Sequence, residues 1–161
     1  MRKEHTIGSL FDEKSKVLIL GSFPSVKSRE QGFFYGHPQN RFWKVIAAIL
    51  CEPLPKTIDE KRTMLIKNNI ALWDVIASCD ILGSSDSSIK NVIPNDISII
   101  LDTADIKAIF TNGKTSFNLY NKYILPKTDV KPIYLPSTSP ANAAFSVKKL
   151  IDEWKIIKEY L

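Results

Sequence analysis

Cysteine is scarce in this sequence, which has only Cys51 and Cys79 among its 161 residues. Two thiols are too few for a four-thiolate iron–sulfur cluster or a zinc finger, which excludes both kinds of metal site. Each cysteine stands beside apolar residues, and disulfides are rare in the cytosol. We therefore expect two buried free thiols.

Long apolar runs and targeting signals are also absent. No run approaches the roughly 20 apolar residues that a membrane helix needs, so we expect no contact with a membrane. The first residues, MRKEHTIGSLFDEKSK, lack the apolar core of a secretory signal, and we expect a cytoplasmic protein. There is no internal repeat, low-complexity tail or linker, so residues 1–161 are expected to form a single domain.

The chain has no long run of basic residues, although its net charge is +5 and its pI is about 9.1. This balance is compatible with a polyanionic partner and equally with a mildly basic soluble protein. Hydrophobic residues make up 44% of the chain and charged residues 24%. That composition supports a real core and excludes global disorder.

Four short apolar runs have the character of buried strands. Continuous apolar runs, rather than alternating ones, are typical of strands that are covered on both faces. The runs are Val17–Leu20, Ile70–Trp73, Ile106–Phe110 and Pro132–Leu135.

Helical patterns fall between these runs. They cover residues 41–50, 57–68 with a capping box at its start, 114–124, and a last segment from about residue 145. Asn95 is suited to cap a short helix through Leu101, and the alternative is a strand over Ile97–Leu101. The alternation predicts an α/β fold, a three-layer sandwich with a central four-stranded parallel sheet.

In such a sheet, ligands bind outside the carboxyl ends of the strands. The first run leads directly into Gly21–Ser25, the third into Thr111–Lys114 and the fourth into Pro136–Asn142. An aromatic loop, FFYGHPQN, follows the first of these segments. We expect all of them on one edge of the sheet.

The string GSFPSVKSREQGFFYGHPQNRFW, residues 21–43, resembles the first motif region of the uracil-DNA glycosylase superfamily. Mismatch-specific and thymine-DNA glycosylases share the spacing to H-P-x-N-R-F-W. The late STSPAN at 137–142 and the TNGK at 111–114 are similar to later motifs. The hypoxanthine-DNA (deoxyinosine) glycosylase branch is the most similar in its GSFPS start and its STSPAN.

This resemblance implies a four-stranded parallel sheet and hydrolysis of the bond between a damaged base and deoxyribose. It implies double-stranded DNA as partner and neither a cofactor nor a metal, and we expect a monomer. Phe23 stands where the superfamily normally has an Asn or Asp that positions water. In the hypoxanthine branch that role belongs to the Asn of H-P-x-N, which is Asn40 here.

Asn40 is chemically adequate for this role. Breaking an N-glycosidic bond through a cation-like sugar asks little basicity of the water nucleophile, so an amide that only positions water suffices. Asn40 also stands just before a predicted helix, and Asn is among the best N-caps. Both interpretations remain open from the sequence.

The aromatic loop offers a surface for an extruded base. By spacing, Tyr35 takes the place of the superfamily's base-stacking aromatic, whereas Phe33 and Phe34 are interpreted as core. Backbone N–H groups of Ser22 and Phe23, after Gly21, are suited to bind the leaving purine anion.

Two further side chains are predicted to bind the base. His37 has a hydrogen to donate to the base or a phosphate, but a His-Pro pair is also a plain rigid turn. Asn112 could read the base edge with its amide, or merely occupy a turn.

Residues after the fourth run are predicted to contact DNA. Their hydroxyls and backbone donors suit phosphates, with a plain capping loop as the alternative. They are Ser137, Thr138, Ser139, Pro140, Ala141 and Asn142, together with Lys114, which is otherwise a solvated lysine. Ala141 stands where the superfamily often has a Leu wedge and is too small to act as one. Ser87 and Ser88 are weaker phosphate candidates.

Two rival functions remain. A uracil or mismatch glycosylase is disfavoured because Phe23 replaces the usual water-holding residue. A non-catalytic binder of damaged DNA would keep the pocket but leave no abasic sites. No lysine is marked as a nucleophile for strand cleavage, so we expect a monofunctional enzyme.

Overall fold

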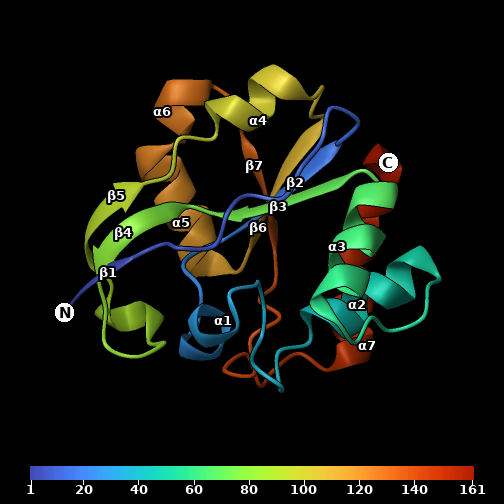
Figure 1. The fold of residues 1–161 in the computed structure, drawn as a ribbon, viewed down its shortest axis with the longest axis horizontal. Helices are drawn as coiled ribbons and strands as arrows, with labels where there is room; N and C mark the ends of the chain where they lie inside the picture. Colours follow the sequence, from blue (N-terminus) through green and yellow to red (C-terminus); the bar gives the residue numbers. More distant parts are fainter.

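A sheet of four parallel strands lies at the centre of the computed structural model, which describes residues 1–161 (Figure 1). The strands lie in the order β3-β2-β6-β7, and every neighbouring pair is parallel. They are β2 (Val17–Gly21), β3 (Ile70–Asp74), β6 (Ala108–Asn112) and β7 (Pro132–Leu135). The predicted central sheet is therefore confirmed, with the third strand two residues later than expected.

Helices cover both faces of this sheet, which confirms the three-layer arrangement (Figure 1). One face carries α2 (Phe42–Leu50), α3 (Ile58–Lys67), α7 (Val147–Trp154) and the 3-10 helix η2 (Lys155–Tyr160). The other face carries α4 (Ser98–Thr103), α5 (Lys114–Tyr123) and α6 (Leu125–Thr128).

The packing on both faces of strand β2 explains why its sequence is apolar throughout. Val17 and Ile19 pack into the same cluster as Phe42 of α2. Leu18 and Leu20 point to the opposite face and pack into a second cluster with residues of α4 and α5. All four strand residues are fully buried, so the alternation that would mark a half-exposed strand is missing.

A second, antiparallel sheet was not predicted. Its strands are β1 (Arg2–Glu4), β4 (Ile76–Asp80) and β5 (Lys90–Pro94), in the order β1-β4-β5. Strand β4 begins almost directly after β3, so no turn signal separates them in the sequence. Three short helices were also missed, namely α1 (Val26–Gln31), η1 (Asp86–Ser88) and α6.

Of the helix caps predicted at Thr57 and Asn95, only the first is confirmed. The Thr57 hydroxyl accepts a hydrogen bond from the Glu60 N–H at 3.1 Å, so the cap of α3 is confirmed. Segment 95–101 contains a helix, α4, but Asn95 is not its cap: the Asp96 carboxylate accepts from the Ser98 N–H at 3.0 Å. Helix α7 begins at Val147, two residues after the predicted start at about residue 145. The Ser146 hydroxyl caps it by accepting from the Lys149 N–H.

The expectation of two buried thiols is wrong for one of them. Cys79 is buried in β4, whereas Cys51 is exposed in a left-handed conformation at the end of α2. A helix end in that conformation turns the chain outward, which places the side chain in solvent. No helix combines the length and apolar character that a bilayer crossing would require.

Candidate active site

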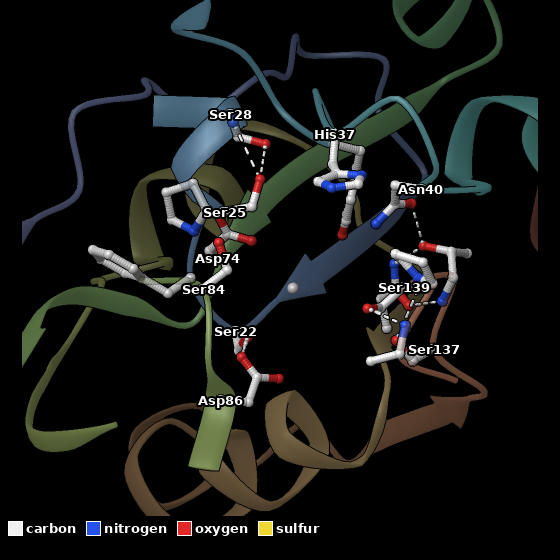
Figure 2. Close-up of a pocket in the computed structure, with 18 of the residues that line it drawn as sticks. Ser22, Ser25, Ser28, His37, Asn40, Asp74, Ser84, Asp86, Ser137 and Ser139 are labelled. Carbon is white, nitrogen blue, oxygen red and sulfur yellow. Dashed lines mark hydrogen bonds between the residues drawn. The ribbon is translucent and has the colours of Figure 1, made fainter. Parts of the chain in front are cut away.

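A cavity of about 470 Å³ lies at the carboxyl ends of the parallel strands (Figure 2). The loops after β2 and β7 and the last residues of β3 and β6 form its wall, together with a serine-rich loop at residues 84–87. Parallel α/β sheets bind their ligands at this edge, and the volume is in the range of small-ligand sites.

This cavity brings together every residue predicted for catalysis or base binding. They are Gly21, Ser22, Phe23, Tyr35, His37, Asn40 and Asn112. Of the predicted DNA contacts, Ser137–Ala141 also line the cavity. Lys114 does not, and is exposed at the start of α5. Asn142 also lies outside the lining and donates to the Ser137 carbonyl at 3.0 Å.

Asn40 is held by a chain of hydrogen bonds from the far side of the cavity. The Thr138 hydroxyl donates to Asn40 Oδ1 at 2.8 Å, and Asn112 Nδ2 donates to the Thr138 hydroxyl at 3.0 Å. The Phe42 N–H donates to the same Asn40 oxygen at 2.9 Å. With Oδ1 occupied twice, the amide Nδ2 has no protein acceptor and points toward the cavity (Figure 2).

These bonds bear on the two interpretations of Asn40. The N-cap position of α2 belongs to Arg41, which makes no side-chain cap. Asn40 still satisfies one backbone donor of the first turn through Oδ1. The local structural role uses the oxygen and leaves the nitrogen free, so the two interpretations do not exclude one another.

Asn112 and Thr138 are more tightly engaged with each other than predicted. Besides the bond between their side chains, the Thr138 N–H donates to Asn112 Oδ1 at 3.0 Å. Thr138 is fully buried, so its hydroxyl faces Asn40 rather than solvent. Both residues therefore position Asn40.

Arg41 is a site residue that sequence reasoning missed. Its guanidinium donates to the backbone carbonyls of Thr138, Ser139, Asn142 and Phe145. A planar group with several fixed donors is suited to hold a bent segment of main chain. These hydrogen bonds hold the loop after β7 against the start of α2, next to Asn40.

Tyr35 lies with its ring stacked on Phe42, 4.1 Å between centroids. Its backbone is left-handed, with φ of 52°, which is rare for a bulky residue. The phenol oxygen is buried and has no hydrogen-bond partner. Burial, with the negative charge of Asp74, raises the pKa of Tyr35 far above its usual range, so the phenol keeps its proton. Phe33 and Phe34 are buried core residues, as predicted.

Donors for an anionic leaving group are present along the β2 loop. The N–H groups of Ser22 and Phe23 donate to no protein acceptor. The Phe23 side chain is buried against the His5 ring and cannot hold water. His37 Nδ1 accepts from the Gln39 N–H at 3.1 Å, so in a neutral ring its Nε2 carries the hydrogen.

The serine-rich loop contributes residues that the sequence did not single out, apart from Ser87. Ser84, Ser85 and Asp86 also line the cavity, whereas Ser88 does not. The Ser22 hydroxyl donates to Asp86 Oδ1 at 3.2 Å. Desolvation at the cavity wall raises the pKa of the Asp86 carboxyl, and this hydrogen bond opposes the shift.

Asp74 and His5 were missed altogether. Asp74 is the last residue of β3, lines the cavity and pairs with His5 at 2.8 Å. Its position could have identified it, because it directly follows the predicted strand Ile70–Trp73, and the carboxyl ends of parallel strands share one edge. No local pattern marks His5, which comes from the small second sheet's N-terminal segment.

Residues 9–159 match the family model described as the uracil DNA glycosylase superfamily. The chain belongs to this superfamily. The resemblance seen in the motifs is thereby confirmed, and membership makes the protein a DNA glycosylase, a hydrolase with DNA as its substrate.

Relatives within the superfamily cover most of the chain. A hypoxanthine DNA glycosylase of Methanosarcina barkeri (strain Fusaro) is 36% identical over 116 residues, 71% of this chain and 73% of the relative. A hypoxanthine DNA glycosylase of Methanosarcina acetivorans is 33% identical over 151 residues, 92% of this chain and 94% of the relative. The solution NMR structure of a candidate uracil DNA glycosylase from M. acetivorans superposes with a TM-score of 0.82 at 32% identity, covering 98% of this chain and 96% of that one.

Proposed function

We propose that this chain is a monofunctional DNA glycosylase that releases a deaminated base, foremost hypoxanthine, from double-stranded DNA. The observation that carries the proposal is the free Asn40 amide nitrogen beside the cavity, in a chain where Phe23 holds no water. Two relatives named hypoxanthine DNA glycosylase, at 36% and 33% identity, support the choice of base. Residues 1–161 act as one domain and as a monomer in this proposal.

The chemistry follows from the polar groups around the cavity. The base leaves the duplex and stacks at Tyr35, whose phenol stays protonated. As the glycosidic bond breaks, negative charge gathers on the base near the free N–H groups of Ser22 and Phe23. Asn40 Nδ2 donates to a water oxygen and holds this water for the sugar cation, which needs no strong base. The water oxygen bonds to the sugar carbon that the base has left, and the proton that the water loses ends on the departing base anion.

Strand cleavage is not part of this proposal. A lyase step proceeds through a lysine amine that attacks the sugar. No lysine is among the residues that line the cavity. The product is therefore an intact strand with an abasic site.

The test is single-turnover base release from duplexes that contain one inosine, uracil, xanthine or adenine. Release of hypoxanthine at the highest rate, with strands that break only after alkali, is the expected result. Uracil released faster than hypoxanthine would favour the uracil-specific alternative. Tight binding of lesion duplexes without any abasic product would leave a non-catalytic binder.

A further inference from the structure

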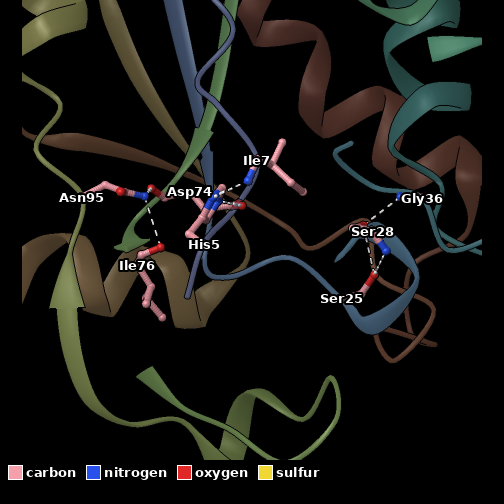
Figure 3. A network of polar contacts seen from close by, with 8 residues as sticks. All are labelled: His5, Ile7, Ser25, Ser28, Gly36, Asp74, Ile76 and Asn95. Carbon is pink, nitrogen blue, oxygen red and sulfur yellow. Dashed lines mark hydrogen bonds and ion pairs between the residues drawn. The ribbon is translucent and has the colours of Figure 1, made fainter. Parts of the chain in front are cut away.

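A buried pair of polar side chains, His5 and Asp74, stands at the edge of the cavity and has no role in the chemistry above. His5 Nε2 lies 2.8 Å from Asp74 Oδ2, and the two side chains are 2% and 5% exposed (Figure 3). His5 follows β1 of the small sheet, whereas Asp74 ends β3 of the central sheet. Burying a carboxylate to this extent costs free energy unless hydrogen bonds or an opposite charge compensate for the lost water.

The hydrogen bonds assign the charge of this pair. The Ile7 N–H donates to His5 Nδ1 at 3.3 Å, so Nδ1 carries no proton (Figure 3). The hydrogen of the neutral imidazole is then on Nε2, which donates to Asp74. A neutral imidazole beside an ionised carboxylate leaves one net negative charge. No lysine or arginine lines the cavity to neutralise it.

One carboxylate oxygen remains free. Asp74 Oδ2 is bound to His5, whereas no protein group donates to Oδ1. A Cβ at Gly21 would lie 2.5 Å from Asp74 Oδ1 and 2.9 Å from the Tyr35 hydroxyl. Only glycine permits both to approach here. An acceptor without a donor and a buried phenol without a partner thus flank one glycine at the cavity wall.

We propose that Asp74 selects the base by the ring hydrogen that deamination creates, and that His5 is the positioning residue that presents its carboxylate. Adenine has a lone pair on N1. Deamination to hypoxanthine puts a hydrogen on N1, and deamination of cytosine does the same at N3. An ionised carboxylate accepts from such an N–H and repels a ring lone pair. This inference rests on the proposed function.

The role of His5 follows from the direction of its bond. By donating to Oδ2, it holds the carboxylate so that Oδ1 is left for the cavity. In Asp74→Asn the same donor would bind the amide oxygen and turn the NH₂ toward the base. The NH₂ group would then face the N1–H of hypoxanthine, which is also a donor, whereas it could donate to the N1 lone pair of adenine.

The test compares single-turnover release from duplexes with inosine, N1-methylinosine or adenine, the methyl group removing the one hydrogen at issue. Wild type is expected to prefer inosine over N1-methylinosine by roughly ten- to hundredfold, the loss typical of one hydrogen bond to a charged group. In Asp74→Asn both the inosine:N1-methylinosine and the inosine:adenine ratios should fall toward one. Asp102→Asn on α4, at the opposite edge of the sheet, is the matched control and should keep both ratios.

His5 is tested with two variants of different donor capacity. His5→Phe removes the donor and should lower the same ratios, whereas His5→Gln restores a donor and should recover part of them. A loss of folding alone would lower all rates together and leave the ratios unchanged.

The outcomes separate this inference from the proposed function. If wild type releases no hypoxanthine, both the proposed function and the inference on Asp74 are refuted. If wild type releases hypoxanthine but does not distinguish inosine from N1-methylinosine, or Asp74→Asn keeps the wild-type ratios, this inference is overturned and the proposed function stands. The wild-type comparison decides even if a variant does not fold.

Discussion

Asn40 divides its two polar atoms between structure and chemistry. Its oxygen accepts from Thr138 and from the first turn of α2, and its nitrogen faces the cavity. Fixing the oxygen by two donors determines the orientation of the amide plane. A residue that looks like a helix cap in the sequence is thereby also able to position water.

Two substitutions at Asn40 separate these roles. Asn40→Asp keeps an acceptor for both bonds but offers no hydrogen to the water, so we expect near wild-type thermal stability and a drop in single-turnover base release of about a hundredfold, as for other lost transition-state donors. Asn40→Ala should lose the same rate and about 1 kcal/mol of stability through the missing cap. Wild-type rates in a folded Asn40→Asp protein would reduce the residue to a cap.

Tyr35 is the second residue with a direct prediction. One ring face is covered by Phe42, and the residue lines the cavity. Tyr35→Ala should lose about 1–3 kcal/mol of base-stacking free energy. It should therefore weaken the binding of lesion DNA more than the binding of undamaged DNA. Titrations of both duplexes measure the difference. Equal weakening would instead indicate a phosphate contact or a damaged fold.

At the level of elements, the loop after β7 depends on α2. The Arg41 guanidinium binds four backbone carbonyls of this loop, which also carries Thr138. Lysine is a point charge and cannot satisfy four acceptors in this geometry. The loop and the first turn of α2 therefore form one structural unit around Asn40.

Arg41→Lys tests this unit. We expect faster amide hydrogen exchange in residues 138–145 and a loss of about 1.5–3 kcal/mol in unfolding free energy, the range for a hydrogen bond to a charged group. Base release should fall because Thr138 no longer holds Asn40. Arg62→Lys, an exposed arginine over the Phe33 ring, is the matched control. Unchanged exchange in the loop would contradict the role of Arg41.

For the whole molecule, charge governs affinity more than selectivity. The net charge is +5, yet no lysine or arginine lines the cavity. We therefore expect DNA attraction to come from lysines outside the cavity, through phosphate contacts that release counterions. Each contact contributes about −0.9 to the slope of log affinity against log salt.

We expect binding of undamaged and lesion duplexes to weaken in parallel as salt rises. The slope should correspond to only a few phosphate contacts, because the lysines are dispersed. Fluorescence anisotropy over a salt series measures it for both duplexes. Lesion binding that does not change between low and high salt would show that phosphate attraction is unimportant.

The sequence by itself determined the central sheet, its helical layers and the edge that carries the site. Continuous apolar runs and capping residues act locally, so they can be read without knowing the fold. Asn40 and Tyr35 were found because they lie in a region that begins at the end of a strand and resembles the first motif region of the superfamily. The second sheet was hidden because β1 and β5 are short and largely exposed, and because β4 follows β3 without a turn signal.

Only the tertiary structure decided which atoms are free to act. The Thr138 hydroxyl reaches Asn40 across 98 positions in the chain, and His5 reaches Asp74 across 69. Such partners are set by how the sheets and loops pack, and no residue spacing encodes them. The free nitrogen of Asn40 and the free oxygen of Asp74 are consequences of those distant bonds, because each amide or carboxylate has a second atom that the fold has already engaged.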